Sequence, residues 1–512
     1  MNEKGDGSML RTPKAWSLSL AVIMMLSIVL SACGGSKESN GTTADGQLAP
    51  VELIFYNYAT PMKGQDRVME KVNEYLKKKI NATIKVVTME GSDFETKVPV
   101  MLASGQPMDI VFTSSWTNNY LSNVSKQAFT PLTPLLDQYG QDLKKTVPDT
   151  LWKGMTVNKE LYAVPIYKEI GHQVGVLFRK DLVDKYKLNV AGIQSWKDME
   201  PILKTLHEKD PSILALDGTE GMYRSFPVQH MSGDWNLPGI INVGDKPYYA
   251  RSDDKIFNQY DTPEFKEFVE TAYKWNQAGY TPKDVDYQSE NDWKAGKVFA
   301  GSLLYAPNYV YKRSAQLGYE LDYQNLGKGV VETSDVQGGA YAIPRSSKNP
   351  ERAMMFLNLL YTDPTLANLF VHGIEGQDYT KVDDQFIKPA EGVDAANPDY
   401  DYGYGWMWGN VNIFYYDQSY PKDTLEQFKK FEDNNTPAPA LGFNFDTTPV
   451  QTEIAAINNV ISEYYKPLVT GTVNPDEYLP KFIQKLKDAG VDNMLAEMQT
   501  QYDTWKSQQT GS

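Results

Sequence analysis

Five aromatic residues alternate with other residue types near the C-terminal end of the chain: Tyr400, Tyr402, Tyr404, Trp406 and Trp408. In an extended backbone, residues two positions apart point to the same face. Gly403 and Gly405 lie among them, and a glycine weakens a buried strand because it has no side chain to pack. The spacing favours an exposed platform of rings on which a flat partner such as a sugar ring stacks, and we predict ligand contact for Trp406 and Trp408. The alternative is that these rings cover a core or a seam between two lobes.

Aromatic and polar residues also follow several predicted strands. In a parallel sheet covered by helices, ligands bind beyond the carboxyl ends of the strands, so residues placed there face one cleft. Each of these residues alone is better explained by packing or by the surface, but their convergence predicts a binding site. The candidate ligand residues at strand ends are Tyr58, Ser115, Trp116, Tyr167, Lys168, Glu169, Tyr305 and Asn308.

The sequence carries none of the common signatures of enzymes or metal sites. It has no Gly-x-Ser-x-Gly, His-Glu-x-x-His or Gly-x-x-x-x-Gly-Lys-Ser/Thr motif. Its four histidines are not spaced as a local metal pair. A segment from Asp284 begins like a calcium loop, but Ser289 stands where the turn needs glycine and Ala295 where the bidentate glutamate belongs. We therefore predict no catalytic residue, no metal and no cofactor, although 65 acidic residues allow many carboxylate pairs in space.

The elements that must position these residues begin in the order β-α-β-α-β. Short runs rich in β-branched and aromatic residues predict strands at 51–57, 82–88 and 109–114, with helical patterns between them. This order is typical of a mainly parallel sheet covered by helices. Further strands and helices follow, with helix starts at Thr262-Pro263, Asn349-Pro350 and Asn474-Pro475. We predict an α/β protein.

Length and charge narrow the class of protein. About 460 of the 512 residues follow the first 50, which is too many for one ordinary core and suggests two or more lobes. The formal net charge is −15, and an acidic surface argues against nucleic acid, whose phosphates require a basic face. The 33 tyrosines and 10 tryptophans are abundant, so the location of the rings becomes the central question.

The only cysteine, Cys33, follows a basic start and an uncharged stretch at 16–32 that is short for a membrane span of about 20 residues. This pattern is typical of a secretory signal peptide, which we place at 1–32. Leu30-Ser31-Ala32-Cys33 resembles the bacterial lipobox, which implies cleavage before Cys33 and a diacylglyceryl group on its sulfur. Residues 33–50, rich in glycine, serine and threonine, predict a flexible tether. An uncleaved anchor with an incidental cysteine is the alternative.

Several motifs, in their order along the chain, resemble the family 1 extracellular solute-binding lipoproteins of ABC importers. They are SGQPMDIVFTSSWTNNYLS, LYAVPIYKEIGHQVGVLFRKDLVDKYKL, WKAGKVFAGS and GGAYAIPRSSKNPERAMMFLNLLYTDP. The resemblance extends to about residue 375, and the part at about 395–508 looks like the uncharacterised C-terminal domain of Paenibacillus-type members. Glu169 lies where carbohydrate binders of the family often have an acidic residue. Ser114 to Trp116 match the family's ligand loop in place, though not in residue type.

The resemblance implies a type II periplasmic-binding-protein-like fold, with two α/β lobes, a hinge and a ligand cleft between the lobes. We expect the first lobe at 51–165 and 297–345, and the second lobe at 166–296 and 346–512. In this family the ligand is trapped as the lobes close, and the closed complex docks on a membrane permease that is driven by a separate ATPase.

Together these features predict a monomeric, lipid-anchored oligosaccharide receptor of an ABC importer on the extracytoplasmic face of the cell membrane. One alternative ligand is an acidic glycan such as an aldouronate, whose carboxylate would pair with Lys63, Lys168 or Arg224. A peptide ligand is a second alternative. A surface-anchored glycan hydrolase and a structural adhesin are alternatives from other classes of protein.

Overall fold

The first sheet forms from the strands that the sequence predicts. β1 (Val51–Tyr58) pairs in parallel with β2 (Ala82–Met89) and β3 (Ile110–Thr113). The sheet continues through β14 (Ala340–Ala342), which pairs antiparallel with β3 and with β6 (Ala163–Pro165), giving the order β2-β1-β3-β14-β6. Two strands far apart in the sequence thus complete a sheet that the N-terminal segment begins.

The computed structural model describes residues 48–509 apart from 224–225, 244–254, 308, 396 and 404–405. The predicted signal peptide, Cys33 and the tether up to residue 47 lie outside the described residues, as do Arg224 and Asn308. From Val51 onward the chain forms one compact unit. Within the described part, no helix combines the length and the apolar character needed to cross a membrane.

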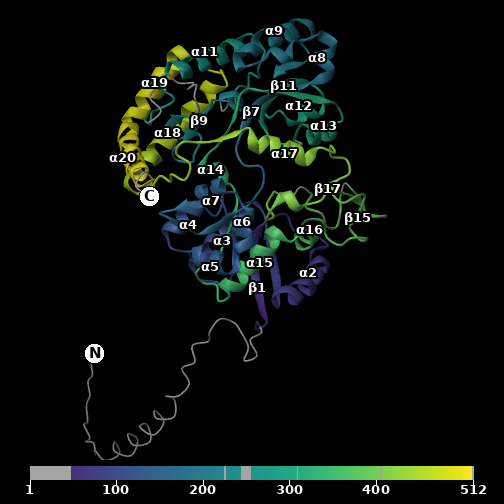
Figure 1. Cartoon of the computed structure of the whole chain (residues 1–512). Coiled ribbons are helices and arrows are strands. Elements are labelled where there is room, and N and C mark those ends of the chain that lie inside the picture. The colour runs from purple at the N-terminus through teal and green to yellow at the C-terminus, as the bar shows by residue number, and fades with distance from the viewer. Residues whose placement is uncertain are drawn as a thin grey trace, which may run out of the picture. The chain divides into compact units, whose positions relative to one another are not determined.

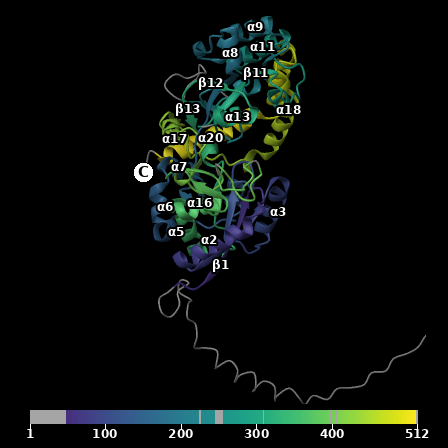
Figure 2. The ribbon, with the colours of Figure 1, turned by 90° about the vertical axis from the view of Figure 1, so that its right-hand side faces the viewer.

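Helices cover the first sheet and enclose its core. α2 (Gln65–Ile80) and α16 (Pro364–His372) pack side by side (Figure 2), and α15 (Pro350–Thr362) lies next to them (Figure 1). The buried side chains of these helices join the strands in one hydrophobic core, which we call the first core. α15 begins at Asn349-Pro350, as the sequence predicts.

A second sheet and core are built around β7 (Gln173–Arg179). β7 pairs antiparallel with β12 (Leu321–Asn325) and with β11 (Val298–Tyr305), and β11 pairs in parallel with β8 (Leu214–Leu216). The second core also contains apolar faces of α11 (Pro263–Gln277) and of three C-terminal helices that pack against one another (Figure 1). Those helices are α18 (Gln451–Val469), α19 (Pro475–Asp488) and α20 (Val491–Gln509).

The chain passes between the two cores at three places: 166–172, β13 (Gly329–Val331) and β18 (Asn435–Pro437). β13 and β18 pair in parallel, and His172 forms a bridge to Val330. Asn435 joins the crossings further, since its amide nitrogen donates to the Ile170 carbonyl and its amide oxygen accepts from Gln173. A Cβ atom at Gly329 would lie 1.7 Å from that oxygen, so only glycine fits there.

The pairing corrects two of the expected lobe boundaries. We expected 297–345 to return to the first lobe, but β11 and β12 pair with β7 and belong to the second sheet. We expected 346–512 in the second lobe, but α15, α16 and the segment up to Phe414 bury their side chains in the first core. Local patterns predict that a strand or helix forms, whereas partners far away in the sequence decide which sheet receives it.

A small sheet lies beyond the first core. β15 (Tyr379–Lys381) pairs with β16 (Phe386–Pro389), which pairs with β17 (Tyr416–Asp417). α17 (Thr424–Asp433) follows and buries Phe428 against Phe386 and Tyr416. This small sheet is therefore a satellite with its own apolar cluster.

Candidate functional site

Three aromatic residues that the sequence singles out lie together. Tyr58 is the last residue of β1, and its ring meets the ring of Trp116 edge to face at 5.0 Å between centroids. The ring of Trp116 lies 6.5 Å from that of Trp406. Trp116 and Trp406 are 48% and 36% exposed, which is unusual for tryptophan. We call Tyr58, Trp116 and Trp406 the ring patch.

The loop after β3 holds Trp116 in place. The hydroxyl of buried Ser114 donates to the Thr117 carbonyl at 3.0 Å and accepts from the Thr117 amide at 2.9 Å, which closes a tight turn around Trp116. The indole nitrogen of Trp116 donates to the Gly338 carbonyl at 2.8 Å. Because the ring is fixed before any ligand arrives, less entropy is lost when a ligand stacks on it.

Trp408 does not belong to the ring patch, which corrects the sequence prediction. It is 1% exposed and packs against Phe55, Phe370 and Tyr402 in the first core. The predicted alternation requires an extended backbone, but Gly403 and Gly409 adopt positive φ angles of 62° and 57°, and the chain turns between them. The turns break the period of two and send Trp406 outward and Trp408 inward.

The crossing segment lies directly beside the aromatic loop. The Tyr167 amide donates to the Gly409 carbonyl, and the Val411 amide donates to the Tyr167 carbonyl, both at 2.9 Å. Burial raises the pKa of Tyr167 to about 12, and the carboxylate of Glu432 adds to this. Burial also raises the pKa of Glu432, with Asp433 and Glu169 contributing. Two carboxyl groups, at Glu169 and Glu432, therefore face the same neighbourhood as Tyr167.

Helix α13 (Tyr309–Leu317) brings residues of the second core's side to this region. Burial lowers the pKa of Lys312, and the nearby Glu169 carboxylate opposes that shift. Lys312 also places its amine 5.1 Å from the ring centroid of Tyr420, and Tyr311 lies 6.1 Å from the same ring. α13 therefore meets the crossing segment and the segment that follows β17.

Exposed apolar side chains concentrate around these segments. Seven large hydrophobic residues are exposed among those that the structure describes, and five of them lie in the ring patch or in β11 and α13: Trp116, Leu304, Tyr309, Tyr311 and Trp406. The sequence analysis missed Tyr309 and Tyr311. Their position directly after the candidate Asn308 was the available signal, since loops at strand ends often continue into the ligand site.

The remaining candidate ligand residues lie in different surroundings. Half-buried Ser115 donates its amide to the Gln337 carbonyl, and Lys168 donates its amine to the Glu169 carbonyl at 3.3 Å. Tyr305 ends β11 opposite Gln173, and nothing is described of its side chain. The described residues hold no group of three or more His, Cys, Asp or Glu side chains arranged to bind a metal ion. The arrangement can stack flat rings on the ring patch and offer hydrogen bonds from the crossing segment.

Comparisons with known proteins give consistent matches. A model of bacterial extracellular solute-binding proteins matches residues 60–367, and a model of a domain of unknown function (DUF3502) matches residues 439–507. A carbohydrate ABC transporter substrate-binding protein of Streptococcus pneumoniae is 30% identical, over 96% of this chain and 98% of that protein. Lipoprotein LipO of Bacillus subtilis is 22% identical, over 74% of this chain and 76% of that protein.

Among solved structures, the chain is similar to the N-glycan transport solute-binding protein NgtS of Streptococcus pneumoniae. The TM-score is 0.79 at 29% identity, covering 89% of this chain and 98% of that one. Structures of NgtS in complex with Man1GlcNAc and with Man5GlcNAc give TM-scores of 0.69 and 0.66 at the same identity.

Proposed function

Because the chain belongs to the bacterial extracellular solute-binding proteins, we propose that it captures a neutral oligosaccharide and delivers it to the permease of an ABC importer. Its membership confirms the predicted family and the predicted type II periplasmic-binding-protein-like fold. The family consists of binding proteins rather than enzymes, which excludes the alternative that the chain is a glycan hydrolase. The observation that carries the proposal is the pair of exposed rings of Trp116 and Trp406, of which Trp116 is held by its hydrogen bond to Gly338.

The pneumococcal relative supports a glycan as the ligand. NgtS is described as an N-glycan transport protein, and its complexes contain Man1GlcNAc and Man5GlcNAc. The TM-score to this chain falls from 0.79 to 0.69 and 0.66 in those complexes, and such a change between structures of one protein reflects a change in its conformation. This supports capture by a movement of two lobes about the crossing segments.

Capture follows from binding that differs between two conformations. A ligand shifts an equilibrium only by its differential affinity for the two states. A sugar on the ring patch contacts only the side of the molecule that holds the first core. Tyr309 and Tyr311 of α13 offer contacts from the side that holds the second core. Contacts from both sides favour the closed conformation, and the three crossings act as the hinge.

Local charge favours a neutral glycan over an acidic one. The carboxyl groups of Glu169 and Glu432 lie near Tyr167, so a uronate bound there would meet like charges. Lys168 already donates to a carbonyl of its own segment. Lys63, exposed in the loop after β1, and Lys168 remain the described partners for the aldouronate alternative. A peptide ligand is less suited to the exposed rings.

Location at the membrane is a further part of the proposal. The lipobox at Cys33 would carry the lipid, and its acyl chains would anchor the protein on the extracytoplasmic face. The relative LipO is named a lipoprotein, which supports this assignment. We propose a monomer that needs no cofactor. Replacing Cys33 by serine should release the protein from membranes into the medium, as measured by fractionation.

Calorimetric titration of the protein without its lipid tests the ligand class. Man1GlcNAc and an aldouronate of similar length should be titrated in parallel, because the first is neutral and the second carries a carboxylate. We expect the neutral glycan to bind, and Trp116→Ala to weaken that binding at least about tenfold, since a tryptophan at the centre of an interface carries about 2 kcal/mol or more.

The control is Val382→Ala, which removes an exposed apolar side chain from the small sheet rather than from the ring patch. It should leave the affinity unchanged. Binding of the aldouronate alone would overturn the neutral ligand in favour of the acidic one. An unchanged affinity in Trp116→Ala would show that the ring patch is not the site.

A further inference from the structure

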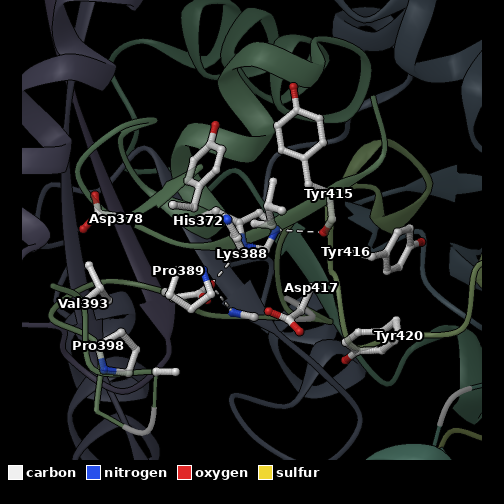
Figure 3. Close-up of a pocket in the computed structure, with 15 residues that line it drawn as sticks. His372, Asp378, Lys388, Pro389, Val393, Pro398, Tyr415, Tyr416, Asp417 and Tyr420 are labelled. Atoms are coloured by element: carbon white, nitrogen blue, oxygen red, sulfur yellow. Dashed lines mark hydrogen bonds and ion pairs between the residues drawn. The ribbon is translucent and has the colours of Figure 1, made fainter. Parts of the chain in front are cut away.

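A pocket opens on the small sheet, outside the ring patch. It encloses about 120 Å³, and Figure 3 shows Tyr415, Tyr416 and Tyr420 on one side of it and Asp378, Val393 and Pro398 on the other. All of its described lining residues fall between 372 and 420, so it is built by the first core's side of the molecule alone.

The volume of the pocket fits one sugar ring. By this measure a cavity needs about 10–15 Å³ to hold one water, so the pocket has room for roughly eight to twelve water-sized groups. That is about the number of non-hydrogen atoms in one sugar residue. A nucleotide or a large cofactor is too big for the enclosed space.

Tyrosine rings form the walls. The rings of Tyr379 and Tyr415 lie 6.0 Å apart, and those of Tyr416 and Tyr420 lie 5.9 Å apart. Lys381, which does not line the pocket, places its amine 4.8 Å from the centroid of the Tyr415 ring. Tyr379 and Tyr416 are buried, and the Tyr416 hydroxyl donates to the Val411 carbonyl. The half-buried Tyr415 and Tyr420 are therefore the rings that can offer apolar faces to the C–H groups of a sugar.

Polar groups at the pocket have hydrogen-bonding capacity left for a ligand. Asp401 uses Oδ1 for the His372 ring and the Gly403 amide, and its Oδ2 accepts no hydrogen bond from the described residues. Asp417 likewise uses Oδ1 for Ser419. The exposed amine of Lys388 makes no ion pair within the described part of the chain. Acceptors and a donor at the rim of an apolar pocket suit a hydroxylated neutral ligand.

The framework of the pocket is fixed without a ligand. Arg67 of α2 donates to both oxygens of buried Asp378, at 2.8 and 2.6 Å, and the Ile374 amide donates to the same carboxylate. His372 is 3% exposed, and its Nε2 lies 3.0 Å from the Tyr415 carbonyl, as Figure 3 shows. These contacts hold both ends of the lining segment to the first core, so the pocket is preformed.

The pocket adjoins the ring patch along the chain. Gly403 lines the pocket, and Trp406 follows three residues later, so their Cα atoms lie no more than about 11 Å apart. Tyr420, on the opposite wall, lies next to Tyr311 and Lys312 of α13. A short oligosaccharide on the ring patch can therefore reach the pocket.

We propose that this pocket is a second sugar subsite, which receives one further ring or branch of the oligosaccharide whose main part stacks on the ring patch. The inference rests on the proposed function. Because the pocket belongs to one side of the molecule, its contact is made before and after any movement of the lobes. The subsite adds affinity for larger glycans without requiring closure.

Titration with Man1GlcNAc and Man5GlcNAc, which differ in the number of rings beyond a common type of core, tests the inference. Tyr415→Ala removes one aromatic ring from the pocket lining. Lys388→Ala changes an exposed lining residue and provides a second test if Tyr415→Ala is unstable. We expect both variants to weaken Man5GlcNAc about tenfold and to leave Man1GlcNAc within about twofold. Trp116→Ala should weaken both glycans.

The outcomes separate this inference from the proposed function. If the unmodified protein binds both glycans and the pocket variants change neither affinity, the subsite is wrong and the function stands. Equal weakening of both glycans by folded pocket variants, checked by their thermal transitions, would also overturn a separate subsite. If the unmodified protein binds neither glycan, the neutral-glycan proposal fails, and the subsite fails with it.

Discussion

The two cores use aromatic residues in opposite ways. On the side of the first core, rings stay exposed at Trp116, in the loop after β3, and at Trp406, in the turn before Gly409. In the second core, a cluster of rings is almost completely buried, with centroid distances of 5.0 to 6.4 Å around Tyr260. The members of that cluster are Tyr223, Tyr260, Phe265, Tyr465 and Phe482. An abundance of rings alone therefore does not predict an exposed ring surface.

The largest effect is expected from two tryptophans that are two residues apart. Trp408→Ala should lower the free energy of unfolding by about 3–5 kcal/mol, because it leaves a cavity in the first core. Trp406→Ala should change stability by no more than about 0.5 kcal/mol, since its ring is exposed. Denaturant titration of both variants measures the difference. Equal destabilisation by the two variants would contradict the division between the ring patch and the core.

The crossing segment at 166–172 also carries a buried ionisable side chain, His172. His172 is 5% exposed, with its Nδ1 3.0 Å from Asp335 and its Nε2 3.6 Å from Glu332, which also binds His230. Burial alone lowers the pKa of His172, but the two carboxylates outweigh it and raise the pKa to about 9. The folded protein therefore favours the charged form of His172 beside the two carboxylates, and the contribution of this group to the free energy of unfolding depends on pH.

We expect the free energy of unfolding to fall by about 3 kcal/mol as the pH rises from 6.5 to 9. The folded pKa of His172 is raised, so its contribution is complete below the unfolded value of 6.5 and is lost as the pH approaches 9. His172→Gln and Asp335→Asn should both reduce this slope. Stability curves at several pH values provide the measurement, and a wild-type slope that neither variant changes would exclude His172 as its source.

A smaller effect on stability is expected from a buried tyrosine of the second core. The Tyr260 hydroxyl donates to the Asn236 carbonyl at 2.6 Å, and the side chain is fully buried. Tyr260→Phe should cost about 1 kcal/mol of stability, because one hydrogen bond is lost while the ring packing remains. Affinity for Man1GlcNAc should stay the same. A change in glycan affinity greater than about twofold would show that the buried cluster also serves binding.

Local patterns predicted the elements well. The strands expected at 51–57, 82–88 and 109–114 are β1, β2 and β3, and the helices that start at Thr262-Pro263 and Asn474-Pro475 have side-chain caps at Thr262 and Asn474. These features depend on neighbours within a few residues, which a sequence displays directly.

Features that depend on distant partners were harder to predict. Assignment of β11 to the second sheet depends on its pairing with β7, more than a hundred residues earlier. Trp408 is buried because turns at Gly403 and Gly409 interrupt an apparent alternation. Tyr58 and Trp116 were predicted because the position of a residue at a strand end is visible in the sequence, and Trp406 because of its place in the aromatic alternation, although the distances between the rings are not visible there.

The place of β14 in the first sheet has a consequence for the order in which the protein can fold during synthesis. β14 lies between β3 and β6, so the sheet lacks an inner strand until residue 342 has been made. Trp408 and Val411 complete the same core still later, and the second core waits for α18 to α20. Neither core can complete its folding while the chain is still short. Both cores therefore stay incompletely folded until almost the entire chain has been synthesised.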